Sequence, residues 1–205
     1  MEYGFLLAGG FLLGCLHALD ADHVATVSSL LLDRRSLKQT VLLALRWALG
    51  HSLTLLMLAG LITPLREVFA QVNLGVMERV VGLSMIYLAV WLALREVRHK
   101  RDAHVDAGGV PQRSGWVLFG MGVLHGTAGW AGVLILVPVA LFQFPAGVIG
   151  YIALFCLGMI VTMSVYAAMV NRVTAFEHVA RHLGKIRYAT AAVTLAIGTR
   201  LVMAM

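Results

Sequence analysis

Charged residues are scarce in this chain. Aspartate, glutamate, lysine and arginine make up 13% of its 205 residues, whereas they form about a quarter of an average soluble domain. Hydrophobic residues make up 60%. A water-soluble fold of this length could not bury so much apolar surface, because a small domain keeps a large share of its residues in contact with water. The composition therefore excludes an ordinary soluble domain and predicts a membrane protein.

Cysteine is scarce as well. Cys15 and Cys156 both lie within apolar runs, without a CxxC spacing, so the sequence predicts neither a disulfide framework nor a thiolate metal site. The amino terminus carries no basic segment ahead of its first apolar run, and that run contains His and Asp. These features argue against a cleaved signal peptide.

Long apolar runs predict the membrane spans. They lie at about 3–32, 39–62, 80–94, 116–141, 146–170 and 186–205. A span needs roughly 20 apolar residues to cross a hydrocarbon layer of ~30 Å, so the chain has room for six spans and no separate soluble domain. We expect an all-α polytopic membrane protein, in which residues 1–205 form a single transmembrane domain with halves at about 1–94 and 116–205 and a loop over 95–115.

The distribution of basic residues predicts the orientation. A net charge of +6 could indicate nucleic-acid binding, but the Lys and Arg residues lie in short clusters between the apolar runs. If successive loops alternate between the two sides of the membrane, twelve of the fourteen basic residues in the loops lie on one side and two lie on the other. By the positive-inside rule the richer side is cytoplasmic. Both termini are then external, in a membrane that we take to be the bacterial cytoplasmic membrane, and no nucleic-acid partner is expected.

The first apolar run is too long for one straight span. Thirty residues of helix would measure about 45 Å, at ~1.5 Å per residue. The polar segment His17-Ala-Leu-Asp20-Ala-Asp22-His23 lies in its middle, and on a regular helix its four ionisable side chains could not all face one ion. We therefore expect the first helix to be broken or tilted, since unwound backbone is tolerated in a membrane where it lines a cavity.

A weak internal repeat relates the two halves. A shift of 108 positions superposes matching residues: Gly14 and His17 on Gly122 and His125, Gly50 on Gly158, and Arg79 on Arg187. Because each half holds three spans, the second half would insert upside down relative to the first. This 3+3 inverted repeat is typical of secondary transporters, whose substrate site lies near the bilayer midplane between the repeats.

Ionisable residues inside a span call for partners or a function, because an Asp at the centre costs about 2.5–3.5 kcal/mol. The candidate metal ligands are the cluster in the first span, the histidine of the second span and the repeat counterpart of the first histidine: His17, Asp20, Asp22, His23, His51 and His125. Imidazole with some carboxylate suits Ni, Co, Cu and Zn better than Mg or Ca. The ion would be transported cargo, and no resident cofactor is expected.

Two motifs resemble those of the nickel/cobalt transporter family. The segment from His17 to His23 is similar to its His-x4-Asp-His signature, and Leu49-Gly50-His51-Ser52 is similar to its second motif. The resemblance implies that His17, Asp22 and His23 bind Ni²⁺ or Co²⁺, with a contribution from His51. The six predicted spans resemble the compact branch of urease and hydrogenase accessory transporters. Leu16, which stands where the family usually has Arg, is a further point of resemblance to this branch. Residues 95–115 do not resemble the His-rich loop of efflux members, which favours uptake.

Other interpretations of these residues stay open. The cluster could be a hydrogen-bond network that packs helices, or a proton relay. The pair His17 and Asp22 fits the His-x4-Asp spacing of lipid acyltransferases, and a membrane metal-dependent hydrolase or a metal-efflux protein would use similar residues. No soluble domain accompanies the pattern, so we predict a transporter and not an enzyme. Its partners are the metal ion and the bilayer, with a second copy of the chain or an accessory metallochaperone as further candidates.

Overall fold

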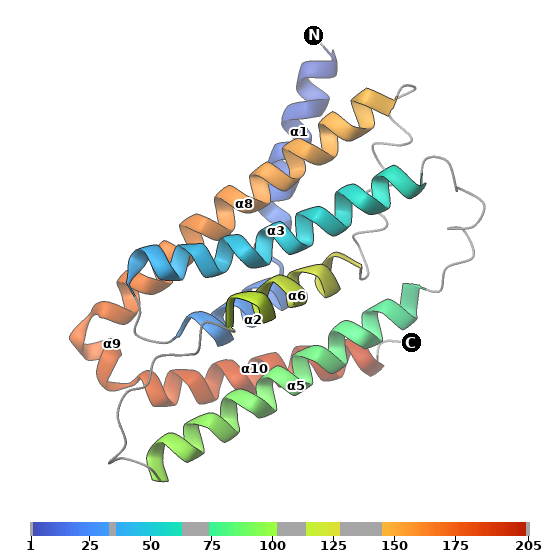
Figure 1. The fold of residues 1–205 in the computed structure, drawn as a ribbon. Helices are drawn as coiled ribbons and strands as arrows, with labels where there is room; N and C mark the ends of the chain where they lie inside the picture. The colour runs from blue at the N-terminus through green and yellow to red at the C-terminus, as the bar shows by residue number, and fades with distance from the viewer. Residues whose placement is uncertain (1, 33–35, 63–73, 102–113, 128–144, 204–205) are drawn as a thin grey trace.

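The computed structural model is helical throughout the residues it describes, which are 2–32, 36–62, 74–101, 114–127 and 145–203 (Figure 1). The helices are α1 (Glu2–His17), α2 (Ala21–Leu31), α3 (Leu37–Ile62), α5 (Leu74–Arg101), α6 (Ser114–Gly126), α8 (Pro145–Ala175), α9 (Glu177–Arg181) and α10 (Leu183–Met203). The all-α fold is confirmed. The part of the fourth predicted span from 128 to 141 lies outside the described residues.

Two of the described helices are individually long and apolar enough to cross a bilayer. They are α3 over Leu37–Gly60 and α8 over Ala146–Ala175, with mean hydropathies of 1.6 and 2.3. α1 and α2 together form a third candidate, bent by 56°. α6 is a shorter apolar helix, while α5 and α10 are long but more polar. The chain is a polytopic membrane protein with a broken first helix, and the total of six spans stays a prediction.

The break between α1 and α2 has a local cause. The amides of Leu19 and Asp20 bond to the carbonyls three residues earlier, at 2.9 and 3.1 Å, which tightens the last turn of α1. Asp20 then has φ −58° and ψ 146°, an extended backbone from which α2 starts. Aspartate commonly caps a helix with its side chain, but the Asp20 carboxylate makes no such bond. It accepts a hydrogen bond from His17 instead.

Two glycines bring α1 and α8 into close contact. A side chain at Gly14 would collide with the carbonyl oxygen of Phe155, and one at Gly158 would collide with that of Phe11. Such crossings of small residues are common between membrane helices, since backbones can approach only where no side chain intervenes.

α3 and α6 cross in the same manner. Gly50 lies against the carbonyl oxygen of Phe119, and Gly122 lies against that of Trp47. All four residues are counterparts, at 108 positions, of the four residues at the α1/α8 crossing. The first helix of each half therefore packs on the second helix of the other half, which agrees with an inverted repeat.

The third helices of the two halves pack on each other. Where α5 crosses α10, a Cβ atom at Gly82 or Gly198 would lie 2.7 or 2.8 Å from the carbonyl oxygen of the other glycine. These residues are 116 positions apart and not 108. The shift that superposes Arg79 on Arg187 therefore does not describe this crossing.

α5 continues through Arg95–Arg101, at the start of the segment that we expected to be a loop. Arg, Glu and Lys, which make up most of this segment, are strong helix formers, so a helix need not end where the membrane does. Figure 1 shows that one side of the bundle holds the C-terminal ends of α2, α5 and α8 and the N-terminal ends of α3, α6 and α10. Both chain termini lie away from this side.

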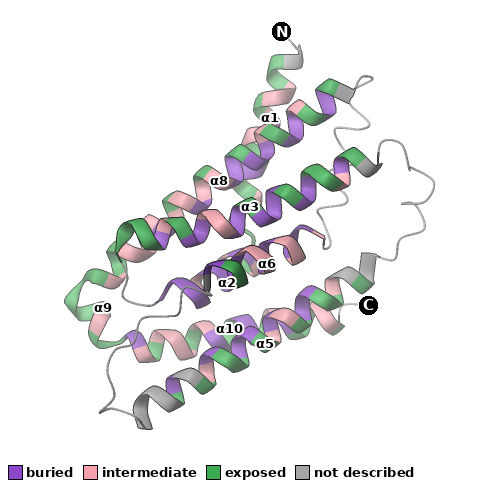
Figure 2. Cartoon of the chain, in the orientation of Figure 1, coloured by how far each residue is buried: buried purple, intermediate pink, exposed green. Residues whose placement is uncertain are grey.

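Buried residues lie on the inner faces of the helices, and exposed residues lie on their outer faces (Figure 2). The main core gathers residues from five helices around Trp47, Leu118, Met159 and Met163. Phe5, Tyr87 and Trp116 are among the exposed apolar side chains. Exposed apolar residues of this size, spread over the outer helix surfaces, suit contact with lipid.

Candidate metal-binding site

Three histidines from three helices meet at the break in the first span. His17 ends α1, His23 lies in the first turns of α2, and His51 lies in α3. One ring nitrogen of each lies within 4.8 Å of those of the others. Metal–imidazole distances of about 2.0–2.1 Å place tetrahedral nitrogen ligands ~3.4 Å apart. A small inward movement of the side chains would therefore let the three rings share one ion.

Several ring nitrogens of these three histidines are buried and have no hydrogen-bond partner among the described residues. Nε2 of His17, Nδ1 of His23 and both ring nitrogens of His51 have no hydrogen-bond partner in the described part of the chain. His23 and His51 are 2% and 0% exposed. A buried polar atom left unpaired costs about 1–3 kcal/mol, so four of them together are unfavourable in a site that only packs helices. A metal ion would accept one lone pair from each ring, since a neutral imidazole has a free lone pair on only one of its two nitrogens.

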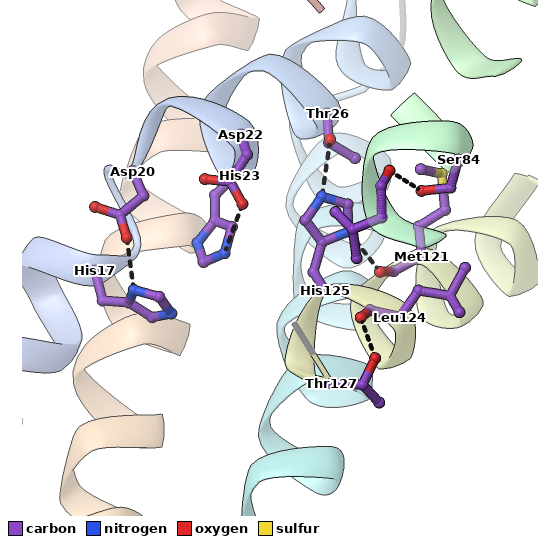
Figure 3. A network of polar contacts seen from close by, with 11 residues as sticks. His17, Asp20, Asp22, His23, Thr26, Ser84, Met121, Leu124, His125 and Thr127 are labelled. Carbon is purple, nitrogen blue, oxygen red and sulfur yellow. Dashed lines mark hydrogen bonds and ion pairs between the residues drawn. The ribbon is translucent and has the colours of Figure 1, made fainter. Parts of the chain in front are cut away.

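Each aspartate of the break contacts one histidine (Figure 3). Nδ1 of His17 donates a hydrogen bond to Oδ2 of Asp20 at 2.7 Å, and Oδ2 of Asp22 lies 3.6 Å from Nε2 of His23. The aspartate side chains are 49% and 29% exposed, so they lie on the open side of the cluster. With its proton held on Nδ1, His17 keeps its lone pair on Nε2, an arrangement common in metal sites.

His125 lies beside the cluster and is held by other groups. Its Nδ1 donates to the carbonyl oxygen of Met121 at 2.8 Å, and its Nε2 lies 3.3 Å from the hydroxyl oxygen of Thr26. Since Nδ1 carries the proton, Nε2 accepts from the hydroxyl. The ring centroid lies 5.8 Å from that of His23. Of the six predicted ligands, the structure thus brings three histidines together and places His125 and the two aspartates next to them.

Trp47 is a neighbour of the site that the sequence did not single out. Its fully buried ring lies 4.9, 5.4 and 5.9 Å from the rings of His23, His51 and His125. Its position four residues before His51, on the same face of α3, is the signal that could have identified it. The indole limits the rotation of the rings and excludes water from the inner side of the cluster.

Comparison with known proteins decides the family. Residues 4–113, more than half of the chain, match the family model described as high-affinity nickel-transport protein. The chain belongs to this family. The match covers both motifs and the three clustered histidines, and it ends before His125. The resemblance to nickel/cobalt transporters is confirmed, and the chain is a membrane protein of a metal-transport family.

Two curated proteins are similar to the chain. The urease accessory protein UreH of Bacillus sp. (strain TB-90) is 28% identical over 177 residues, which cover 81% of this chain and 76% of the relative. The Arabidopsis thaliana protein called Chloroplast protein FOR GROWTH AND FERTILITY 1 is 24% identical over 216 residues, which cover 95% of this chain and 58% of the relative. No solved structure matches the chain.

Proposed function

We propose that this protein carries Ni²⁺ or Co²⁺ inward across the bacterial cytoplasmic membrane, and that His17, His23 and His51 bind the ion on its way. The observation that carries the proposal is the convergence of three histidines, with buried nitrogens that lack partners, at the break of a membrane helix. The name of the UreH relative, a urease accessory protein, supports nickel as the cargo.

The chemistry of the site suits a divalent ion that must lose its water. The exposed carboxylate of Asp20 and the partly exposed carboxylate of Asp22 attract a cation to the open side of the cluster. Three neutral imidazoles then replace part of the hydration shell, and they are ligands that Ni²⁺ and Co²⁺ accept readily. Because the α1/α8 pair and the α3/α6 pair each contribute ligands to the site, rocking of one pair against the other would expose the ion to each side in turn.

The contacts within the cluster argue against an acyltransferase. In such an enzyme the aspartate of a His-x4-Asp pair would orient the histidine that deprotonates a hydroxyl. Here Asp20, and not Asp22, bonds to His17, while Asp22 lies next to His23. A proton relay needs continuous hydrogen bonds, and the nitrogens without partners interrupt such a chain. Uptake is favoured over efflux because residues 95–115 contain only two histidines.

Metal uptake into proteoliposomes tests the function. Vesicles with the purified protein and a trapped metal-sensitive dye should take up Ni²⁺ or Co²⁺ saturably, and each ion should compete with the other more strongly than Mn²⁺ does. Vesicles with the His23→Ala protein should behave as empty ones, and His182→Ala, at an exposed histidine of the α9–α10 junction, should leave uptake unchanged. Absence of ion movement with the wild-type protein, or acyl transfer that survives strict chelation, would overturn the proposal.

A further inference from the structure

We propose that His125 is a second station for the metal ion, a position that the ion reaches from the three-histidine site while His23 stays bound to it. This rests on the proposed function, since a station needs an ion to receive. In Figure 3, His23 lies between His17 and His125.

The distances allow such a transfer. The ring centroids of His23 and His125 are 5.8 Å apart, close to the 5.5 Å between His17 and His51 within the three-histidine site. An ion on His23 can therefore gain His125 as it loses another ligand, and it is never bound by water alone. Exchange of one ligand at a time keeps the barrier low, because the hydration lost on entry need not be restored.

His125 is fixed in the tautomer that a metal ligand needs. Its Nδ1 proton is held by the carbonyl of Met121, so the lone pair of Nε2 points toward Thr26 of α2. The contact of Nε2 with the hydroxyl is long, at 3.3 Å, compared with about 2.7–2.8 Å for a good hydroxyl hydrogen bond. A weak bond of this kind is readily exchanged for a metal ion.

Two further buried hydroxyl groups lie past the contact between His125 and Thr26, which Figure 3 shows. Thr26 lies one turn beyond His23, and the next turn carries Ser29, whose hydroxyl lies 3.0 Å from that of Thr194 in α10. Thr26, Ser29 and Thr194 are at most 3% exposed. Since α2 runs from the break to the side where α3, α6 and α10 begin, Ser29 lies nearer than the three-histidine site to the predicted cytoplasmic side.

The repeat gives the transfer a direction. His17 and His125 are counterparts, and each lies at the end of the first helix of its half. An ion that moves from His17 to His125 therefore passes from a ligand of the first half to its equivalent in the second. In an inverted repeat these two positions open to opposite sides of the membrane.

The decisive variant is His125→Asn. The amide nitrogen of its side chain can still donate to Met121, but no lone pair replaces Nε2. Equilibrium binding of Ni²⁺ to the purified full-length protein should stay within about threefold of wild type, because the three-histidine site is intact, whereas the rate of uptake into proteoliposomes should fall roughly 10–100-fold. His182→Asn is a matched control, since His182 Nδ1 also donates to the carbonyl four residues earlier, at 2.9 Å.

Thr26→Val tests the contact between His125 and Thr26 by changing the threonine instead of the histidine. The two side chains are similar in shape, and the substitution frees the lone pair of His125. If His125 only packs against Thr26, both variants should have the same effect. If it is a station, Thr26→Val should keep uptake within about threefold of wild type while His125→Asn loses it.

Two results would overturn the station. Wild-type uptake by His125→Asn would show that the imidazole is not needed, and loss of equilibrium binding as complete as in His23→Ala would make His125 part of a single site. Failure of the proposed function is distinguishable from both, because the wild-type protein would then neither bind nor move the ion.

Discussion

At the scale of single residues, the site depends on three imidazoles that have few other partners. An ion taken from water needs several ligands at once, and removal of one leaves a site too weak to compete with hydration. We predict that His17→Ala, His23→Ala and His51→Ala each abolish transport while the protein stays monodisperse in detergent. Transport assays with size-exclusion profiles check this. Normal transport by the His17→Ala and His23→Ala proteins would mean that the cluster is a packing network.

The bond from His17 to Asp20 makes Asp20 a positioning residue. Its carboxylate holds the proton of His17 on Nδ1, and an amide at the same place could also donate and so stabilise the wrong tautomer. We predict that Asp20→Asn lowers Ni²⁺ affinity by about 10–100-fold, measured by equilibrium titration. Glu177→Gln, at an exposed acidic residue of α9, serves as the control and should bind as wild type. Unchanged affinity in Asp20→Asn would refute this role.

The residue types of the site could be predicted from the sequence, but their pairing could not. His17, His23 and His51 stand in recognisable motifs. A regular helix places Asp20 equally close to His17 and His23, so only the break decides that His17 receives the carboxylate. The contact between His125 and Thr26 joins α6 to α2, and no pattern in the sequence indicates a contact between two residues so far apart in the chain.

At the scale of helices, the positions of the glycines determine where two helices can pack with their backbones in contact. We predict that Gly14→Ala lowers the thermal unfolding temperature and the transport rate, because its Cβ would meet the backbone of Phe155 and neither helix can yield without moving the other. The control is Gly9→Ala on the same helix, where a Cβ would have nothing within 4 Å. Equal unfolding temperatures for the two variants would contradict the close crossing.

Hydropathy located the helices better than it located their ends. The break in the first span was predictable, since thirty apolar residues exceed one bilayer crossing and the polar segment lies in their middle. The continuation of α5 to Arg101 was not, because a helix that leaves the membrane loses its apolar signal and keeps its backbone hydrogen bonds.

At the scale of the whole molecule, charge predicts the orientation. Lys38, Arg172, Arg181 and Lys185 lie at the ends of helices on one side of the bundle, so we expect this side to be cytoplasmic. A cysteine introduced as Met203→Cys should react with an impermeant thiol reagent on intact cells, and one introduced as His182→Cys should react only after permeabilisation. The reverse pattern would invert the topology. Cys15 and Cys156, which are partly and fully buried, are replaced by alanine in this background.

The glycine crossings of α1 with α8 and of α3 with α6 have a consequence for the response of the protein to its own cargo. His17 belongs to the α1/α8 pair and His51 to the α3/α6 pair, so an ion bound by both acts as a removable crosslink between them. Ligand that binds only the folded state stabilises it by about 2.7 kcal/mol at a concentration 100 times the dissociation constant. We predict that Ni²⁺ raises the unfolding temperature of the detergent-solubilised protein and leaves that of His51→Ala unchanged. The protein would then be most resistant to unfolding and proteolysis when nickel is plentiful, and its lifetime in the membrane would follow the supply of the metal.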